Sequence, residues 1–453
     1  MDTHCAAALW QQLWQGLRGA DPLPHLQFEH TDTLSSAFAV SELAATSIGL
    51  AAQALSDLLG NAAPVSVDVR LASRWFQQSV KPVNRPAAAS WDALAGDYAT
   101  RDGWIRLHTN APHHRAALLR TVGHAGDRLA LADAVAAWRG DALEQAVIDA
   151  GGCAAVMRSE QEWLAHPQGM AVEREALIAQ QAVGEAPTPG WPLHPARPLR
   201  GVRVLDLTRI IAGPVATRFL ASLGAQVLRI DPPDWQEPTL EEEMTCGKRC
   251  ARLDLHTHDG RQQLRTLIAH SDVLVHGYRA DALENLGFDA ETRRQLAPGL
   301  VDVSLNAWGW RGPWRNRRGF DSLVQMGCGI AERGMAWRDS AVPTPLPVQG
   351  LDHATGYMMA AAVLEGLRQR RTHHVGWQAH LSLARTARLL QTAGAAPQGV
   401  QNGIMPRPQD TLSALEVNRW GIAERLRAAA YLPGTPMVCA TPAAGLGSSI
   451  ACW

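Results

Sequence analysis

Short apolar segments alternate with amphipathic ones over the second half of the chain. The apolar segments predict strands at residues 202–207, 227–231, 272–276 and 300–307. Segments with helical spacing predict helices at residues 214–223, 261–270, 321–330 and 353–370. Strands that alternate with helices predict an α/β fold with a doubly wound parallel sheet, in which ligands bind beyond the carboxyl ends of the strands.

A proline-rich segment divides the chain. Residues 185–200 contain five prolines, a density that blocks helices and central strands, so we predict an interdomain linker there. A chain of 453 residues is long enough for two domains. Beyond Leu390 the pattern weakens. Residues 392–453 predict only one helix, near residues 422–430, and leave open whether this tail is ordered.

The bulk composition disfavours several classes of function. A formal net charge of -1 gives no general attraction to nucleic acid or to an anionic membrane. The chain contains no run of about 18 uninterrupted apolar residues, and its first residues do not resemble a signal peptide, so we expect a cytoplasmic protein without a membrane span. The seven cysteines are scattered and lack zinc-site spacing, which favours a reducing compartment and predicts no metal site.

A weak internal repeat joins the two ends of the chain. Residues 38–77 align with residues 352–391 without a gap, at an offset of 314 residues, and both segments predict helix, turn, strand and a second helix. Any two helix–strand units resemble one another to this degree, so a true repeat and a chance similarity both remain open. In this register Phe38 aligns with Asp352, and one copy would lack the carboxylate.

Asp352 stands between a loop of prolines and glycines and an apolar helix. In one interpretation its side chain is the N-cap that accepts from the first free backbone N–H groups, which is a common role for Asp. In the other, the helix dipole keeps the carboxylate ionised, as covalent acyl transfer requires. The local pattern favours the cap, and the two roles are compatible.

The predicted strand at residues 202–207 leads through a small-residue turn to Pro214, which predicts an anion site at a helix N-terminus. The glycine spacing of a dinucleotide fingerprint is absent, so the segment disfavours NAD.

An ordered series of motifs resembles the class III (CaiB/BaiF-type) CoA-transferases. The motifs lie at residues 199–207, 212–214, 223–233, 247–249, 253–255, 272–275, 277–279, 283–288, 309–314, 318–321 and 352–356. Residues 98–107, 149–153 and 162–169 are similar to the later part of the same family's chain, so the resemblance implies a rearranged domain order.

The resemblance implies a division of the chain. Residues 1–184 would correspond to the family's smaller α+β domain, residues 185–200 to the linker, and residues 201–391 to a Rossmann-like CoA-binding domain that carries the catalytic aspartate. Residues 392–453 would form the tail. A fused and truncated tandem pair would explain both the order and the repeat.

The resemblance also implies the chemistry. Asp352 matches the family's nucleophile, which forms an aspartyl anhydride and an aspartyl-CoA thioester while CoA passes from an acyl-CoA to an acceptor acid. Coenzyme A is then a substrate, with no permanently bound cofactor, and a homodimer is expected. The family's CoA contacts fall on Ile210, Ile211, Leu253, His256, Gly277, Tyr278, Arg279 and Arg318.

Two alternatives to transfer remain. Racemases of the same fold use a histidine where this chain has Phe320, which cannot transfer a proton, so proton transfer is disfavoured. We expect the neighbouring His353 to be solvated or to serve as a cap. A protein that binds acyl-CoA without catalysis is the other alternative. A second carboxylate of the substrate could be held by Arg209, Arg279, Arg315, Arg317 or Arg318, each of which could equally be a surface charge.

Overall fold

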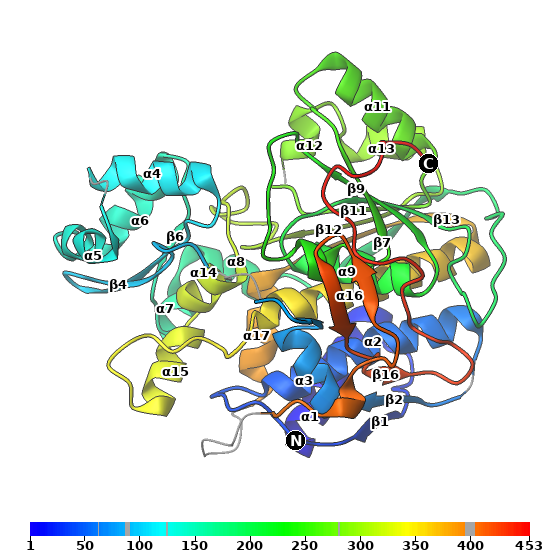
Figure 1. The fold of residues 1–453 in the computed structure, drawn as a ribbon, viewed down its shortest axis with the longest axis horizontal. Coiled ribbons are helices and arrows are strands. Elements are labelled where there is room, and N and C mark those ends of the chain that lie inside the picture. Colours follow the sequence, from blue (N-terminus) through cyan, green and yellow to red (C-terminus); the bar gives the residue numbers. More distant parts are fainter. Residues whose placement is uncertain (62, 87–90, 124–125, 280, 395–403) are drawn as a thin grey trace.

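The computed structural model describes residues 1–61, 63–86, 91–123, 126–279, 281–394 and 404–453, and its centre is a seven-stranded sheet (Figure 1). The spatial order is β10-β9-β8-β11-β12-β13-β7, in which all pairs from β10 to β13 are parallel and β7 is antiparallel to β13. The strands are β7 (Ala179–Glu185), β8 (Arg203–Leu207), β9 (Gln226–Asp231), β10 (Lys248–Arg252), β11 (Val273–His276), β12 (Val301–Asn306) and β13 (Val375–Ser382). The predicted doubly wound α/β fold is confirmed.

Helices cover both faces of this sheet. Successive side chains of a strand point to opposite faces, so Val204 belongs to the core formed with α9 (Ala212–Ser222) and α16 (Gly350–His373). Its neighbour Leu205 belongs to the core on the other face, under α11 (His258–Ala269). The strand order reverses between β8 and β11, which marks the topological switch point of the sheet.

The N-terminal residues belong to the same core. Helix α2 (Val40–Leu59) packs along α16, and α1 (Thr3–Arg18) packs on α2 (Figure 1). The boundary predicted at residue 184 therefore does not separate two cores, because β7 also completes the large sheet. A further sheet nearby contains β1 (Leu26–Glu29), β2 (Val65–Asp68) and β16 (Ala430–Tyr431).

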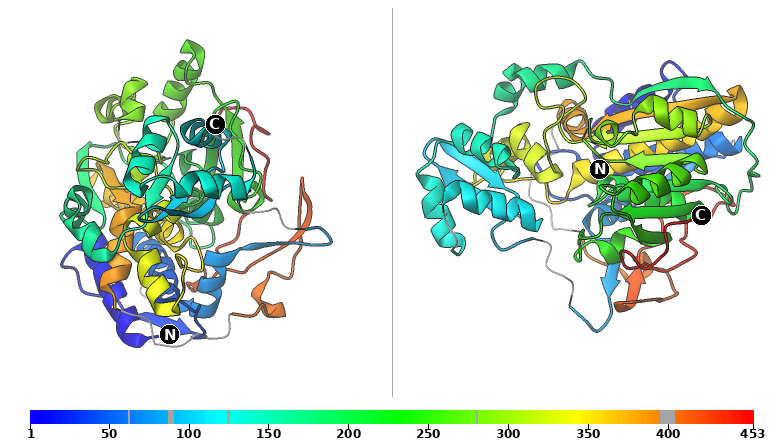
Figure 2. Two further views of the ribbon diagram at one scale, coloured as in Figure 1. Left: turned by 90° about the vertical axis from the view of Figure 1, so that its left-hand side faces the viewer. Right: turned by 90° about the horizontal axis from the view of Figure 1, so that it is seen from above.

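A smaller body with its own apolar core stands beside the main one (Figure 2). Its antiparallel sheet contains β4 (Gly96–Thr100), β5 (Gly103–Leu107) and β6 (Ala154–Val156). Its helices are α4 (Pro112–Val122), α5 (Arg128–Ala136) and α6 (Gly140–Asp149).

The remaining elements connect these bodies. The helices are α3 (Val69–Gln77), α7 (Glu160–Ala165), α8 (Pro167–Glu173), α10 (Glu241–Met244), α12 (Ala282–Asn285), α13 (Ala290–Leu296), α14 (Asp321–Gly327), α15 (Ile330–Arg338), α17 (Leu383–Thr392) and the 3-10 turn η1 (Pro408–Asp410). The strands β3 (Val80–Pro82), β14 (Glu416–Asn418) and β15 (Gly421–Arg425) form another sheet. In the described part of the chain, no helix is long and apolar enough to cross a bilayer.

Several predicted elements differ from the structure. The helix predicted at residues 422–430 is wrong: residues 421–425 form β15, which pairs with β14 and β3, and strand pairing overrides the local helix propensity. The helix predicted at residues 321–330 is divided at Gly329, whose φ of 89° interrupts it. Strands β7 and β10 were not predicted because both lie at sheet edges and are rich in polar residues.

The structure also changes the register of the repeat. The N-caps of α2 and α16, Ala39 and Gln349, have nearly the same backbone angles, with φ of -75° in both and ψ of 59° and 64°. These starts correspond at an offset of 310 residues, so Glu42, not Phe38, stands opposite Asp352. The four additional residues of α16 restore the offset of 314 at the strands, where Asp68 caps α3 as Ser382 caps α17.

Candidate active site

Asp352 is the third residue of α16, and its side chain makes no capping hydrogen bond. The N-cap is Gln349, so the prediction that Asp352 caps the helix is wrong. The acceptor at this helix start comes from α14: Oδ2 of Asp321 accepts the backbone N–H of Asp352 at 2.8 Å. The helix begins three residues earlier than the apolar pattern indicated, which places Asp352 inside its first turn.

Both carboxyl groups are deeply buried. Asp352 is 6% exposed, and burial followed by the charge of Asp321 raises the pKa of Asp352 well above its usual value. Burial also raises the pKa of Asp321, to about 6, although the backbone N–H of Asp352 and the Gln325 amide both lower it. The prediction that the helix dipole keeps Asp352 ionised is therefore wrong, because desolvation and the second carboxyl outweigh the dipole. One negative charge is favoured at this pair, on Asp321.

The start of α16 lies against the start of α9. A Cβ added at Gly356, one turn after Asp352, would lie only 2.4 Å from the carbonyl oxygen of Ala212. Only glycine allows this approach. The contact places the candidate nucleophile close to the segment that follows the carboxyl end of β8.

That segment contains a strained residue. Ile210 has a φ of 68°, in the left-handed region that a β-branched side chain rarely adopts. Its backbone N–H donates to Oε2 of Glu237 at 3.0 Å, and the same oxygen accepts from Nε1 of Trp235 at 3.0 Å. A strained residue fixed by a buried carboxylate is typical of a ligand-binding turn.

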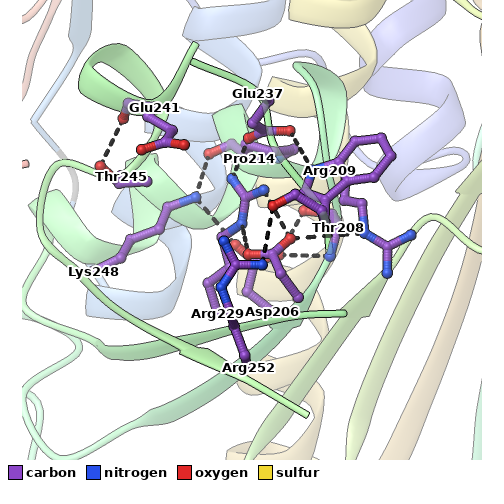
Figure 3. A network of polar contacts seen from close by, with 12 residues as sticks. Asp206, Thr208, Arg209, Pro214, Arg229, Glu237, Glu241, Thr245, Lys248 and Arg252 are labelled. Carbon is purple, nitrogen blue, oxygen red and sulfur yellow. Dashed lines mark hydrogen bonds and ion pairs between the residues drawn. The ribbon is translucent and has the colours of Figure 1, made fainter. Parts of the chain in front are cut away.

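A buried network of charges supports this turn (Figure 3). Nζ of Lys248 lies 3.1 Å from Oδ2 of Asp206, 2.7 Å from Oγ1 of Thr217 and 3.0 Å from the carbonyl oxygen of Pro214. Burial is the largest influence on the pKa of Asp206 and would raise it, but the charges of Lys248 and Arg229 and the hydrogen bonds from Thr208 and Thr217 together lower it. The network thus joins β8, β10 and the start of α9.

A second buried pair continues the network. Arg229 binds Asp231 through two hydrogen bonds of 2.9 and 3.0 Å, and it lies 2.6 Å from Glu237. Sequence reasoning missed the roles of Asp206, Arg229 and Glu237. The sequence did contain a sign of these roles, because Asp206 and Arg229 are charged residues inside apolar strand segments. A charged residue in such a position requires a buried partner.

Most of the predicted CoA-binding residues follow three strands at one edge of the sheet. Ile210 and Ile211 follow β8, Leu253 and His256 follow β10, and residues 277–279 follow β11. His256, Gly277 and Arg279 are exposed, Ile210, Leu253 and Tyr278 are half-buried, and Ile211 is packed into the core. The guanidinium of Arg209 donates to the Tyr278 hydroxyl at 3.1 Å across the switch point.

Arg318 is the member of this set that lies on the smaller body. It is exposed, precedes α14, and its guanidinium donates to the carbonyl oxygen of Gly151 at 3.4 Å. Burial lowers the pKa of His113 on α4, Arg318 lowers it further, and Asp234 opposes both. His113 therefore lies in electrostatic range of Arg318 and of Asp234 in the loop that follows β9.

Phe320, the residue that disfavours racemisation, packs against two histidines. The ring of Phe320 stacks on His108 with centroids 3.9 Å apart, and His114 lies 5.8 Å away. Burial lowers the pKa of His108 and of His114 to about 3, so both are neutral. Phe320 is thus a packing residue between the two bodies.

His353 is neither solvated nor a cap, contrary to the prediction. It is buried, and its ring stacks on Phe76 with centroids 5.0 Å apart. Burial and then the charge of Arg218 lower its pKa to about 3. The early start of α16 places this residue within a complete helical turn that packs against α3.

The candidate arginines separate into two groups. Arg317 binds Glu144 at 3.2 Å, and Arg209 lies 3.7 Å from Asp231, whereas Arg279, Arg315 and Arg318 are exposed. Among the residues that the structure describes, no group of three or more His, Cys, Asp or Glu side chains could hold a metal ion.

Comparison with known proteins agrees with this geometry. Residues 199–419 match the sequence model of the family described as CoA-transferase family III. The chain is 35% identical over 207 residues to an acetyl-coenzyme A transferase, nodX, of Hypoxylon pulicicidum (44% of this chain and 34% of that protein). It is 28% identical over 358 residues to an acyl-CoA transferase of Gibberella moniliformis (74% and 62%).

A third relative is a probable fatty acyl-CoA transferase of Mycobacterium tuberculosis, 33% identical over 202 residues (40% of this chain and 49% of that protein). The matches thus span between about one third and two thirds of the length of these relatives. Residues 199–419 thus resemble CoA-transferase family III, as the motifs predicted.

Proposed function

We propose that this protein transfers coenzyme A from an acyl-CoA to an acceptor carboxylic acid, with Asp352 as the nucleophile. The observation that carries the proposal is the position of Asp352, inside the first turn of a buried helix that starts beside the switch-point edge of a doubly wound sheet. The names of the relatives, which are acyl-CoA and acetyl-CoA transferases, support the same class of reaction.

The proposed reaction proceeds through covalent intermediates on Asp352. Its carboxylate attacks the thioester carbonyl, the C–S bond breaks, and a mixed anhydride and a CoA thiolate form. The thiolate attacks the aspartyl carbonyl, which releases the first acid and leaves an aspartyl-CoA thioester. The acceptor carboxylate then displaces the thiolate to form a second anhydride. Attack of the thiolate on the new acyl group yields the product acyl-CoA and restores Asp352.

The nucleophile must lose its proton before the first step. Because burial and Asp321 raise the pKa of Asp352, ionisation to solvent is unfavourable near neutral pH. We propose that the proton shared by the pair moves from Asp352 to Asp321. This ionises the nucleophile without adding a second charge to the core, and the pKa of about 6 for Asp321 makes it a suitable proton acceptor.

CoA would lie along the carboxyl ends of β8, β10 and β11, on the residues that the family motifs indicate. The strained turn at Ile210, which Glu237 holds in place, would offer backbone to the ligand, and Arg279 on the exposed edge would suit its phosphates. Arg318 would contribute from the smaller body, which we propose acts as the second domain of the site. A homodimer remains a prediction.

A trapping experiment tests the proposal. The protein is incubated with a panel of acyl-CoAs and hydroxylamine, and peptide mass spectrometry should find a hydroxamate at Asp352. Asp352→Asn should abolish the adduct, whereas Glu42→Gln, at the equivalent buried position of α2, should retain it. CoA binding without any adduct across the panel would favour a binding protein. Exchange of the α-proton for deuterium would favour the isomerase.

A further inference from the structure

A cavity of about 330 Å³ lies on the side of the main body opposite to the proposed CoA edge. It is bordered by Ser222 at the end of α9 and by Cys246 just before β10, so it lies at the amino ends of the parallel strands. The proposed CoA contacts follow the carboxyl ends of the same strands. The cavity is therefore a separate site, at the small end of the range of roughly 300–1,000 Å³ for ligand pockets.

Two buried arginines line this cavity with unused hydrogen-bond donors. Arg425 is 6% exposed and binds Glu416 through Nε and Nη2 at 2.7 and 2.8 Å, but its Nη1 has no acceptor among the described residues. Arg218 is 3% exposed, and its Nη1 donates to Oγ of Ser79 at 2.8 Å. Its Nη2 has no acceptor among the residues that the structure describes. A buried donor without an acceptor costs free energy, which a ligand oxygen would recover.

The rest of the wall is mostly apolar. Ile48 of α2, Phe219 of α9, and Leu426 and Met437 of the C-terminal segment contribute aliphatic and aromatic surface. A ligand that fits has one polar end that accepts hydrogen bonds and an apolar body.

The two remaining donors favour an acid over a neutral acceptor, because a carboxylate accepts stronger hydrogen bonds from a guanidinium than a neutral oxygen does. Glu416 lies 2.7 Å from Arg425 and Glu243 lies 3.5 Å from Arg218, so each guanidinium is already paired with one carboxylate. With both cations balanced in this way, the site suits the single charge of a monocarboxylate and not a polyanion.

We propose that this cavity binds a monocarboxylic acid with a medium-length apolar chain, its carboxylate held by Arg425 and Arg218. The cavity borders the helix that carries Asp352, because Tyr357 of α16, five residues after Asp352, also lines the cavity. The proposal does not depend on the reaction at Asp352.

Calorimetric titration of the full chain with octanoate tests the proposal. Octanoate should bind in a one-to-one ratio, and octylammonium, whose apolar chain is one carbon longer and which has no acceptor, should not. Arg425→Met should weaken octanoate binding at least about tenfold, because it removes a charged hydrogen bond. Arg427→Met is the matched control: it removes the same charge two residues away, outside the cavity, and should leave binding unchanged.

Loss of the ion pair with Glu416 could unfold Arg425→Met, so a second variant keeps both arginines. Ala428 is half-buried and lines the cavity, and Ala428→Phe should fill it and weaken octanoate binding to a similar degree. The proposal is overturned if octanoate does not bind, if octylammonium binds equally well, or if Ala428→Phe binds octanoate as the unmodified chain does. The last result would place the bound acid at another site.

Discussion

Oδ2 of Asp321 accepts the backbone N–H of Asp352 at 2.8 Å, so the start of the helix that carries the candidate nucleophile is satisfied by a carboxylate from another helix. The contact ties two acidic residues to one position, and it determines how each of them titrates. It also fixes the backbone of α16 relative to α14, which leaves the side chain of Asp352 free of a capping role.

Replacing Asp321 should change the pH dependence of activity. Asp321→Asn keeps an oxygen that accepts the Asp352 N–H but removes the charge that raises the pKa of Asp352. The same change removes the proposed proton acceptor, so kcat at neutral pH should fall at least about tenfold. The measurement is kcat against pH for both proteins. A variant that keeps the kcat and the pH profile of the unmodified chain would show that Asp321 neither accepts the proton nor controls the nucleophile.

Removing the nucleophile should stabilise the fold. A carboxyl whose pKa is raised in the folded state costs stability above its unfolded pKa, so Asp352→Asn should raise the free energy of unfolding at pH 7 by about 1–3 kcal/mol. The gain should shrink as the pH falls towards about 3, below the pKa of about 3.9 of an unfolded Asp, where the group is protonated in both states. Urea unfolding at the two pH values measures it. A destabilised variant at pH 7 would contradict the assigned pKa shift.

Glycine should be tolerated at the strained turn. The left-handed conformation costs Ile210 about 1–2 kcal/mol, and Ile210→Gly removes this cost. The same change loses the contacts of the side chain and makes the unfolded chain more flexible. Because these effects oppose one another, the free energy of unfolding should change by less than about 1 kcal/mol. Ile211→Gly is the control. Its φ is -123° and its side chain is packed in the core, so it should lose roughly 2–4 kcal/mol. Equal losses in the two variants would show that Ile210 is unstrained.

Breaking the buried network should be costly. Lys248→Met leaves Asp206 buried without its cation and should destabilise the fold by about 3–5 kcal/mol. Adding Asp206→Asn should recover part of this loss, because the amide oxygen still accepts from Thr208. The exposed neighbour Arg249→Met should change stability by less than about 0.5 kcal/mol. Denaturant titration of the unmodified chain, these three variants and the single Asp206→Asn variant measures the coupling, and additive losses from the two buried positions would argue against it.

The central sheet was predictable because its strands are buried on both faces. The segments around Val204, Val227 and Val301 are apolar runs between turns, which is the pattern of a parallel sheet. Edge strands carry no such pattern. Strand β10 begins with Lys248, whose charge is compensated by Asp206, a residue 42 positions earlier in the chain.

The sequence indicated where a candidate site would lie but not its electrostatics. Motif order pointed to Asp352 and to the turn at Ile210 as candidates, because motifs consist of residues close in sequence. The raised pKa of Asp352 depends on Asp321, 31 residues away, and on the burial of both groups. The register of the repeat failed for a related reason: an ungapped alignment cannot detect that α16 is four residues longer than α2 at its end.

The pairing of α2 with α16 has a consequence for assembly. The two helices start alike and pack along one another, yet they belong to one polypeptide. Joining two such elements makes their association intramolecular, with an effective concentration set by the chain between them. The contact between these two helices should therefore persist at any dilution.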